Sequence, residues 1–224
     1  GWWVQLGTVH FWLHDLNTRA STSAAAESVD GEHLAKAMSC YEKAIAICGA
    51  GRYHRAMKEL ALYWSGQCWR MKGRSNFGVD NAVAREAYGR FRSIMKGLAG
   101  EHHDSLLYRT QLFLASVLYA DTCWHLGQVD EAMAIYEAAR KQVTDVDELS
   151  EEWWHGTAGL VAAYNTIGSK ELARGNLKAA KTCFETAHSI ASAWIARSEP
   201  GSSTEMFLDF VHLRLADCSM LQAD

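Results

Sequence analysis

Proline is almost missing from this sequence, which has one, Pro200, among 224 residues. Average proteins contain about 5% proline, and helix interiors exclude it more strongly than any other residue. Long apolar runs are missing as well, since none reaches the roughly 18 residues that a membrane span needs. The sequence therefore favours long helices and predicts no insertion into a membrane.

A surplus of one charge is also lacking, because 22 Lys and Arg stand against 26 Asp and Glu, for a net charge of −4. Without a block of basic residues the chain has no electrostatic footprint for nucleic acid. Its 49% content of hydrophobic residues is ample for a continuous core. We therefore expect a folded protein that binds neither DNA nor RNA.

Cysteine pairs are absent. The six cysteines show neither a C-x-x-C pair nor the close spacing of a disulfide framework; they are Cys40, Cys48, Cys68, Cys123, Cys183 and Cys218. In apolar helical surroundings a free cysteine usually behaves as a small hydrophobic residue. This usage predicts a reducing, intracellular compartment, the cytoplasm, with the nucleus left open.

Motifs of catalysis are lacking too. No strand pattern is present on which a nucleophilic Ser or Cys turn or a Gly-rich phosphate loop could be placed. His10 and His14 lie four residues apart, a spacing that can share a metal, but no Glu follows His10 as in a metalloprotease, and a packed histidine is favoured. His102 and His103 are adjacent and point apart on a helix, which favours a capping or surface role. We expect no enzyme activity, no cofactor and no metal site.

What the sequence does contain is an internal repeat. Four segments place a small residue, an aromatic residue four positions later and a small or aromatic residue three after that, along one face of a helix. Their aromatic residues are separated by 47, 48 and 48 positions; they are Tyr41, Tyr88, Tyr136 and Phe184. The segments between them carry a second helical pattern with a Gly or Ala at one recurring place, at Gly7, Gly66, Ala120, Gly168 and Ala216. This pattern predicts helical hairpins whose two helices approach closely at the small residue.

Glycines punctuate the repeats. Each of the four aromatic segments follows a glycine, at Gly31, Gly78, Gly127 or Gly175, and Asp80, Asp130 or Asn176 comes soon after three of them. Glycine can end one helix, and an Asp or Asn side chain can cap the next. We expect helices near 1–17, 32–49, 52–72, 81–98, 104–126, 129–143, 150–174, 176–196 and 203–222, with a loop from Asn17 to Asp30.

The segment from Leu126 to Ala139, Leu-Gly-Gln-Val-Asp-Glu-Ala-Met-Ala-Ile-Tyr-Glu-Ala-Ala, resembles the tetratricopeptide (TPR) repeat, as does the stretch from Ile167 to Ala187. The repeat of about 48 residues exceeds the usual 34, and most repeats lack a closing proline. The resemblance implies an all-α solenoid, a right-handed superhelix of hairpins near 1–49, 51–98, 103–145 and 149–197, and a final unpaired helix at 203–222. We expect one domain over 1–224, belonging to a larger protein or with ends covered by a partner, because Trp2 and Trp3 are not the polar face of a terminal repeat.

On a TPR-like scaffold the first helices of successive hairpins line a concave groove. Counting from the small residues places ten candidate partner-binding residues there: Phe11, Tyr63, Gln67, Arg70, Val117, Asp121, Trp124, Asn165, Leu172 and Phe210. The aromatic content is typical of interface cores. Only Arg70 and Asn165 could grip a carboxylate, which disfavours acidic C-terminal tails as ligands and favours a helical or extended apolar peptide.

The resemblance therefore predicts a scaffold for protein–protein interaction, whose partner is a peptide, another protein or another domain of the same parent protein. The alternative is a regulatory or sensor arm of a larger enzyme, a protease or an NTPase, whose catalytic domain lies outside this segment.

Overall fold

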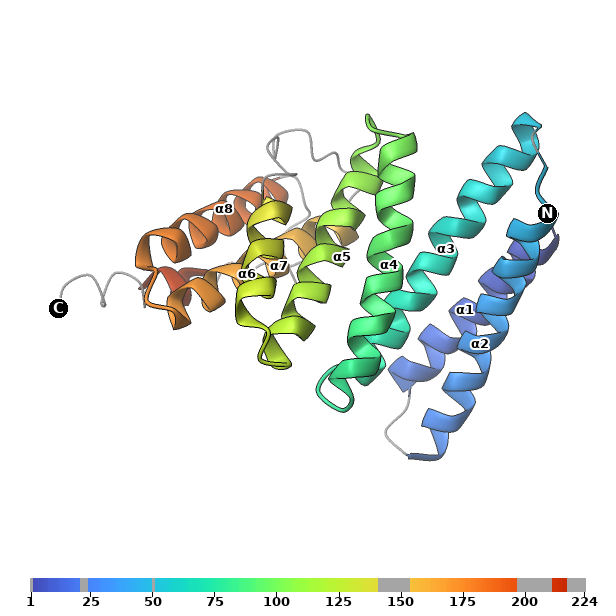
Figure 1. Cartoon of the computed structure of the whole chain (residues 1–224), viewed down its shortest axis with the longest axis horizontal. Coiled ribbons are helices and arrows are strands. Elements are labelled where there is room, and N and C mark those ends of the chain that lie inside the picture. The colour runs from blue at the N-terminus through green and yellow to red at the C-terminus, as the bar shows by residue number, and fades with distance from the viewer. Residues whose placement is uncertain (1, 21–23, 50, 141–153, 197–210, 217–224) are drawn as a thin grey trace. The chain divides into compact units, whose positions relative to one another are not determined.

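A computed structural model describes residues 2–20, 24–49, 51–140, 154–196 and 211–216 of the chain. Within these residues the fold is all-α, as predicted (Figure 1). The helices are α1 (Trp2–Ala20), α2 (Ala24–Ile47), α3 (Arg52–Asn76), α4 (Asn81–Glu101), α5 (Leu106–His125), α6 (Val129–Arg140), α7 (Trp154–Ala173) and α8 (Leu177–Ile195). Residues 211–216 are also helical and are the described part of the predicted final helix.

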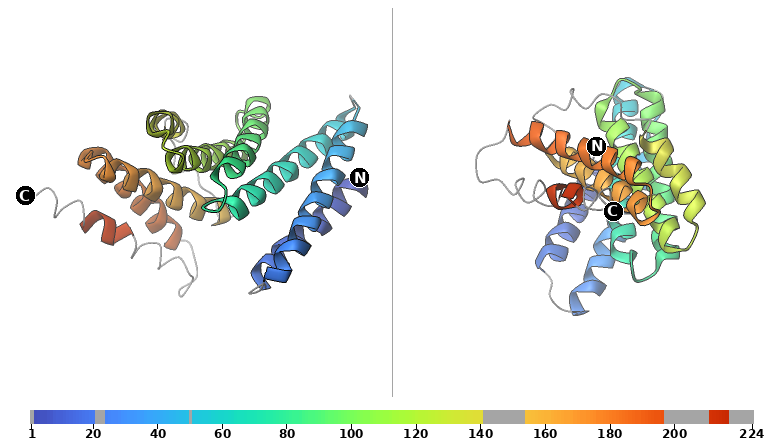
Figure 2. Two further views of the ribbon diagram at one scale, coloured as in Figure 1. Left: turned by 60° about the horizontal axis from the view of Figure 1, so that its bottom comes forward. Right: turned by 90° about the vertical axis from the view of Figure 1, so that its left-hand side faces the viewer.

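Consecutive helices pair into four hairpins, α1–α2, α3–α4, α5–α6 and α7–α8, which confirms the predicted solenoid of hairpins. The chain divides into two compact units, unit 1 from Gly1 to His102 and unit 2 from His103 to Asp224. Between the hairpins of unit 1, α3 packs on α2 and more weakly on α1, and between those of unit 2, α7 packs on α5 (Figures 1 and 2). The single domain, the right-handed superhelix and the repeat length remain predictions.

Three of the predicted punctuating glycines end helices as expected. Gly78, Gly127 and Gly175 have φ of 83°, 80° and 77°, in the left-handed region that glycine adopts without steric cost. The prediction for Gly31 is wrong, because this residue lies inside α2. The expected loop from Asn17 to Asp30 is likewise wrong for its described part, since α1 continues to Ala20 and α2 begins at Ala24.

Side-chain caps start the second helices of two hairpins. The Asp80 carboxylate accepts hydrogen bonds from the backbone N–H groups of Ala82 and Val83, both at 3.1 Å, at the N-terminus of α4. The Asn176 amide oxygen accepts one from the Ala179 N–H at 3.4 Å, at the start of α8. These bonds satisfy donors that the first turn of a helix leaves unpaired, and they fix where each hairpin turns.

In the α1–α2 and α7–α8 hairpins the two helices meet where an aromatic ring lies over a glycine; we call this contact the joint of the hairpin. A Cβ placed on Gly7 would lie 2.8 Å from a ring carbon of Tyr41, and one on Gly168 would lie 2.6 Å from a ring carbon of Phe184. Both rings are fully buried. The predicted close approach of the two helices at the small residue is thereby confirmed in these hairpins.

The α3–α4 hairpin uses a different pairing. Tyr88 packs against Gly73, where an added Cβ would lie 2.5 Å from the ring, and the predicted Gly66 instead receives the end of Met95. The contact is displaced by seven residues, two helical turns, along α3. The second hairpin therefore keeps the same kind of joint in a shifted register.

Each unit has its own core. In unit 1, apolar side chains from α1, α2 and α3 meet around Tyr41. In unit 2, side chains from all four helices and from Val211 meet around Phe113, Tyr136 and Phe184. Four of the five described cysteines are buried, and all five are free thiols, in agreement with their expected role as small hydrophobic residues.

Candidate functional site

Four of the ten candidate residues are buried in the structure. Phe11 is buried against Trp64 of α3, with ring centroids 5.2 Å apart, and Val117 belongs to the core of unit 2. Gln67 and Asn165 are also buried. Counting along a single helix placed them on an exposed face, because it takes no account of side chains from other helices, such as Trp64 against Phe11. In this conformation these four side chains pack inside the protein and present no surface to a partner.

Five candidates keep part of their surface accessible: Tyr63 and Arg70 on α3, Asp121 and Trp124 on α5, and Leu172 on α7. Phe210 lies outside the described residues. The two on α3 belong to unit 1 and the other three belong to unit 2.

In unit 2 a charged pair joins two first helices. The Asp121 carboxylate of α5 lies 3.1 Å from the Lys170 ammonium of α7, and the Tyr136 hydroxyl of α6 donates to the same carboxylate at 3.3 Å. The Lys170 ammonium also lies 5.1 Å from the centroid of a Trp124 ring. Both charged side chains are about four-fifths buried. We call Asp121, Trp124, Lys170 and Leu172 the α5–α7 face.

The Tyr136 hydroxyl beside this face is a stable hydrogen-bond donor. Burial, and next the negative charge of Asp121, raises the pKa of Tyr136, so its hydroxyl stays protonated and remains a donor. The Asp121–Lys170 ion pair is about four-fifths buried, so salt screens it less than a pair on an open surface. This arrangement positions a cation and an indole beside each other at the protein surface.

Lys170 was missed by sequence reasoning. Counting by register gave Asn165, Ser169 and Leu172 on α7, and Lys170 lies between the last two. No pattern in the sequence marks Lys170, because its pairing with Asp121 needs the packing of α5 on α7, which one sequence does not supply.

In unit 1 the accessible candidates stand on one face of α3. The Tyr63 ring packs edge-on against Trp64, with centroids 5.5 Å apart, and burial raises the pKa of Tyr63. Arg70 follows two turns later and lowers that pKa through its positive charge. The pair is an aromatic and cationic surface of the same chemical kind as the α5–α7 face.

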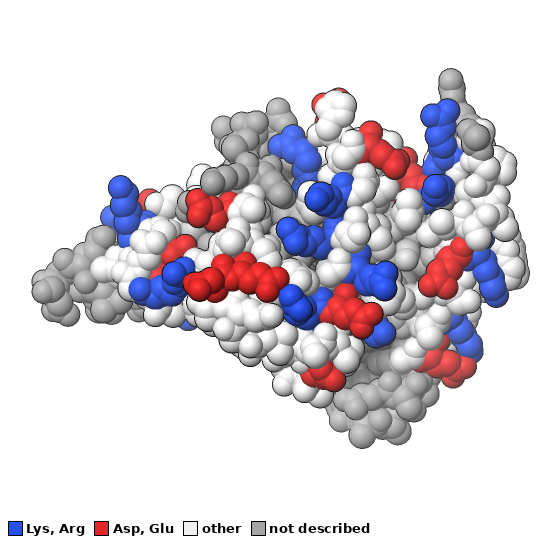
Figure 3. Space-filling model, in the orientation of Figure 1, with Lys and Arg blue, Asp and Glu red and all other residues white. Residues whose placement is uncertain are grey.

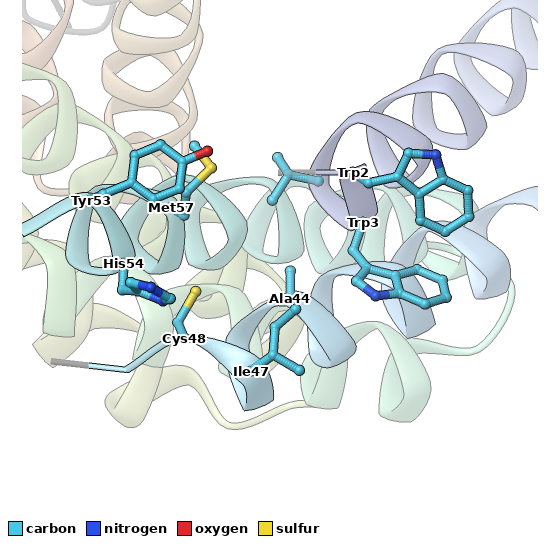
Figure 4. Close-up of a pocket in the computed structure, with 9 residues that line it drawn as sticks. Trp2, Trp3, Ala44, Ile47, Cys48, Tyr53, His54 and Met57 are labelled. Atoms are coloured by element: carbon cyan, nitrogen blue, oxygen red, sulfur yellow. The ribbon is translucent and has the colours of Figure 1, made fainter. Parts of the chain in front are cut away.

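A small apolar pocket of about 190 Å³ lies where the start of α1, the end of α2 and the start of α3 meet (Figure 4). Trp2 and Trp3 line one side, and Tyr53, His54 and Met57 line the other. His54 accepts a hydrogen bond from the Gly49 N–H on Nδ1 at 3.2 Å, which places a proton of the neutral ring on Nε2. Sequence reasoning did not find this pocket, because its walls come from three helix ends.

No three His, Cys, Asp or Glu side chains gather in a metal-binding group among the described residues. None of the helices in the described ranges is both long and apolar enough to cross a membrane. On the face drawn in Figure 3, acidic and basic side chains lie interspersed.

Two of the histidines that the sequence singled out contact a side chain of a neighbouring helix. The Nδ1 atoms of His10 and His33 lie 3.2 Å apart, which joins α1 to α2, and the side chain of His14 is outside the described set. His102 caps the end of α4, where its backbone N–H donates to the Leu98 carbonyl. Its ring Nε2 lies 3.3 Å from a carboxylate oxygen of Glu59. Ser105, rather than a histidine, caps the start of α5.

Comparison with known proteins yields one family. The tetratricopeptide repeat family model matches residues 115–139, which lie in α5 and α6. None of the curated proteins matches the chain. Repeats of this kind are generally non-catalytic and indicate a scaffold for protein–protein interaction. The helical hairpins and the family match together support a TPR-like helical-repeat fold.

Proposed function

We propose that this chain binds a peptide segment of a partner protein across the α5–α7 face of unit 2. The observation that carries the proposal is the Lys170 ammonium, held 3.1 Å from Asp121 and 5.1 Å from the Trp124 ring on a family-matched hairpin. An indole next to a fixed cation offers an apolar anchor and a hydrogen-bond donor at one place. Tryptophan is one of the residues in which the hot spots of protein interfaces are enriched.

The chemistry of the face specifies the ligand. Trp124 and Leu172 are half-buried and would contact apolar side chains of the peptide. Lys170 can donate to a backbone carbonyl of the peptide, since an ammonium carries three donors. Asp121 already neutralises Lys170, so the face does not call for a strongly acidic ligand. An apolar peptide in a helical or extended form fits these groups best.

The test begins with peptides selected from a random displayed library on the full chain, whose affinities are then measured by fluorescence anisotropy. Trp124→Ala and Leu172→Ala should each weaken binding about tenfold or more, as truncation of an interface anchor does. Circular dichroism checks that each variant remains helical.

Leu213→Ala is the matched control for Leu172→Ala. Leu213 is an exposed leucine of residues 211–216 in the same unit, outside the α5–α7 face. Its truncation should leave the affinity within about twofold of the wild type. Equal affinities for all variants would reject the α5–α7 face as the binding surface, and a library that yields no binder would reject peptide binding itself.

A further inference from the structure

The outer face of α1 carries an exposed apolar row. Trp2, Leu6, Val9 and Leu13 are spaced by four, three and four residues, which places them along one side of the helix. The exposed fractions are 64% for Trp2, 54% for Val9 and 38% for Leu13, and Leu6 is half-buried. We call these four residues the α1 stripe. Such a continuous apolar row differs from the scattered exposed residues of an ordinary surface.

The opposite side of α1 already has its partners. Val4 and Phe11 point into the core of unit 1, and Gly7 lies under Tyr41 of α2. Within the described residues of unit 1, α1 packs on α2 and, more weakly, on α3 (Figures 1 and 2). Among the described residues the stripe therefore stays largely exposed, although Trp2 also lines one side of the pocket where α1, α2 and α3 meet.

The corresponding face in unit 2 is covered by a helix. The glycine under each ring aligns Gly7 with Gly168, so Trp2 corresponds to Ala163 and Leu6 to Ile167. Ala163 and Ile167 are only 3% and 2% exposed. On either side of them, α5 contacts α7 through Phe113 with Tyr164, at 5.3 Å between ring centroids, and through Asp121 with Lys170. The repeat itself thus indicates that this face accepts a packed helix.

The chemistry of the stripe selects the kind of helix. At the position of Lys170, which pairs with a charge on α5, α1 carries Val9. No Asp, Glu, Lys or Arg occurs from Trp2 to Leu13. A helix that depends on ion pairs would find no partner here, whereas an uncharged apolar helix would lose no hydration of charged groups on binding.

One helix that meets this description is α1 itself. The spacing of four, three and four reads the same in both directions, so two antiparallel copies of α1 bring Trp2 opposite Leu13 and Leu6 opposite Val9. We propose that the α1 stripe is the contact between two copies of this chain, related by a two-fold axis with the α1 helices antiparallel. Because a two-fold contact uses the same patch on both copies, neither copy keeps a free patch for a third, and the assembly stops at a dimer.

The size of the contact sets the expected strength. Trp2, Val9, Leu13 and the neighbouring exposed Trp12 together leave apolar surface on the order of 500 Å² per copy, given the 150–250 Å² of an aromatic side chain. Two copies would bury about 1,000 Å², at the lower limit of specific interfaces. A dimer with a Kd in the micromolar range is expected.

Sedimentation velocity of the full chain at protomer concentrations from about 1 to 200 µM, which bracket that Kd, tests the proposal. The wild type should shift from monomer to dimer, and Val9→Glu should remain a monomer because its carboxylate would be buried without a partner. Val79→Glu is the matched control, since Val79 is an exposed valine in the α3–α4 turn of the same unit. This variant should dimerise like the wild type.

A mixing experiment separates docking from damage to the fold. Val9→Glu and Val9→Lys should each be monomeric alone, and an equimolar mixture should regain the dimer because the opposite charges lie close to the two-fold axis. A wild type that remains monomeric at about 200 µM overturns the proposal. So does a wild-type dimer that Val9→Glu and Val79→Glu leave equally intact, because its contact would then lie elsewhere.

Discussion

The first hairpin of unit 1 and the last hairpin of unit 2 share a joint but differ in their surroundings. In both, an aromatic ring lies over a glycine, Tyr41 over Gly7 and Phe184 over Gly168. In unit 2, α7 packs against α5 with a charged pair across the contact. The matching face of α1 is uncharged and, among the described residues of unit 1, largely exposed. The contact of ring and glycine is therefore formed within each hairpin. Whether the outer face of its first helix is buried depends on the helix that packs on it.

Truncating the buried aromatic ring of each hairpin should have the largest effect on stability. Tyr41→Ala and Phe184→Ala should each lower the free energy of unfolding by about 3–5 kcal/mol, because both side chains are fully buried and their loss leaves a cavity. Urea unfolding followed by circular dichroism measures both. A loss below about 1 kcal/mol in either hairpin would show that its joint contributes little to stability.

Filling the glycine comes next in size. Gly168→Ala and Gly73→Ala should each cost about 1–3 kcal/mol, since the new methyl group would press on a buried ring. Gly97→Ala is the control: Gly97 lies inside α4 with nothing within 4 Å of an added Cβ, so this change should stabilise by up to about 1 kcal/mol. Thermal unfolding would contradict the account if all three substitutions moved the midpoint in the same direction.

A double-mutant cycle measures what distinguishes the two first helices. Asp121→Asn, Lys170→Met and the double variant should give a coupling free energy of about 1 kcal/mol, because the ion pair is partly buried but still reached by solvent. Salt should reduce this coupling. Independent, additive effects of the two substitutions would mean that the pair does not hold α5 to α7.

The smallest expected effect is a pH dependence in unit 1. Burial, then His33 and Lys36, lowers the pKa of His10, so the folded state binds its proton less readily than the unfolded state. The stability that His10 contributes is therefore complete above pH 6.5 and decreases as the pH falls below that value. His10→Gln should reduce the slope of stability against pH between about pH 7 and 5. An unchanged slope would contradict this assignment.

Much of the fold was accessible to sequence reasoning because its signals are local. The aromatic residues of the hairpins recur at spacings of 47, 48 and 48 positions. Gly78, Gly127 and Gly175 end helices by a conformation that favours glycine. The choice between Gly66 and Gly73 as the seat of Tyr88 was not accessible, because both are small residues on α3 two turns apart. Only the packing of α4 decides between them.

The site was less predictable because it depends on neighbours. Register on a single helix placed Phe11 and Val117 outward, but each packs against a side chain from another helix. Lys170 was missed for the same reason, since its partner Asp121 lies on a different hairpin. Sequence thus predicts the hairpins well, and the surfaces they leave exposed only after their packing is known.

Hydrogen exchange of the full chain, with and without a selected peptide, tests the binding face most directly. Bound peptide should slow exchange in unit 2, most strongly in α5 and α7, because a ligand that binds only the folded state stabilises the region that holds it. Exchange in α1 and α2 should be unchanged. Slowed exchange confined to unit 1, with α5 and α7 unaffected, would contradict the assignment of the α5–α7 face as the partner-binding surface.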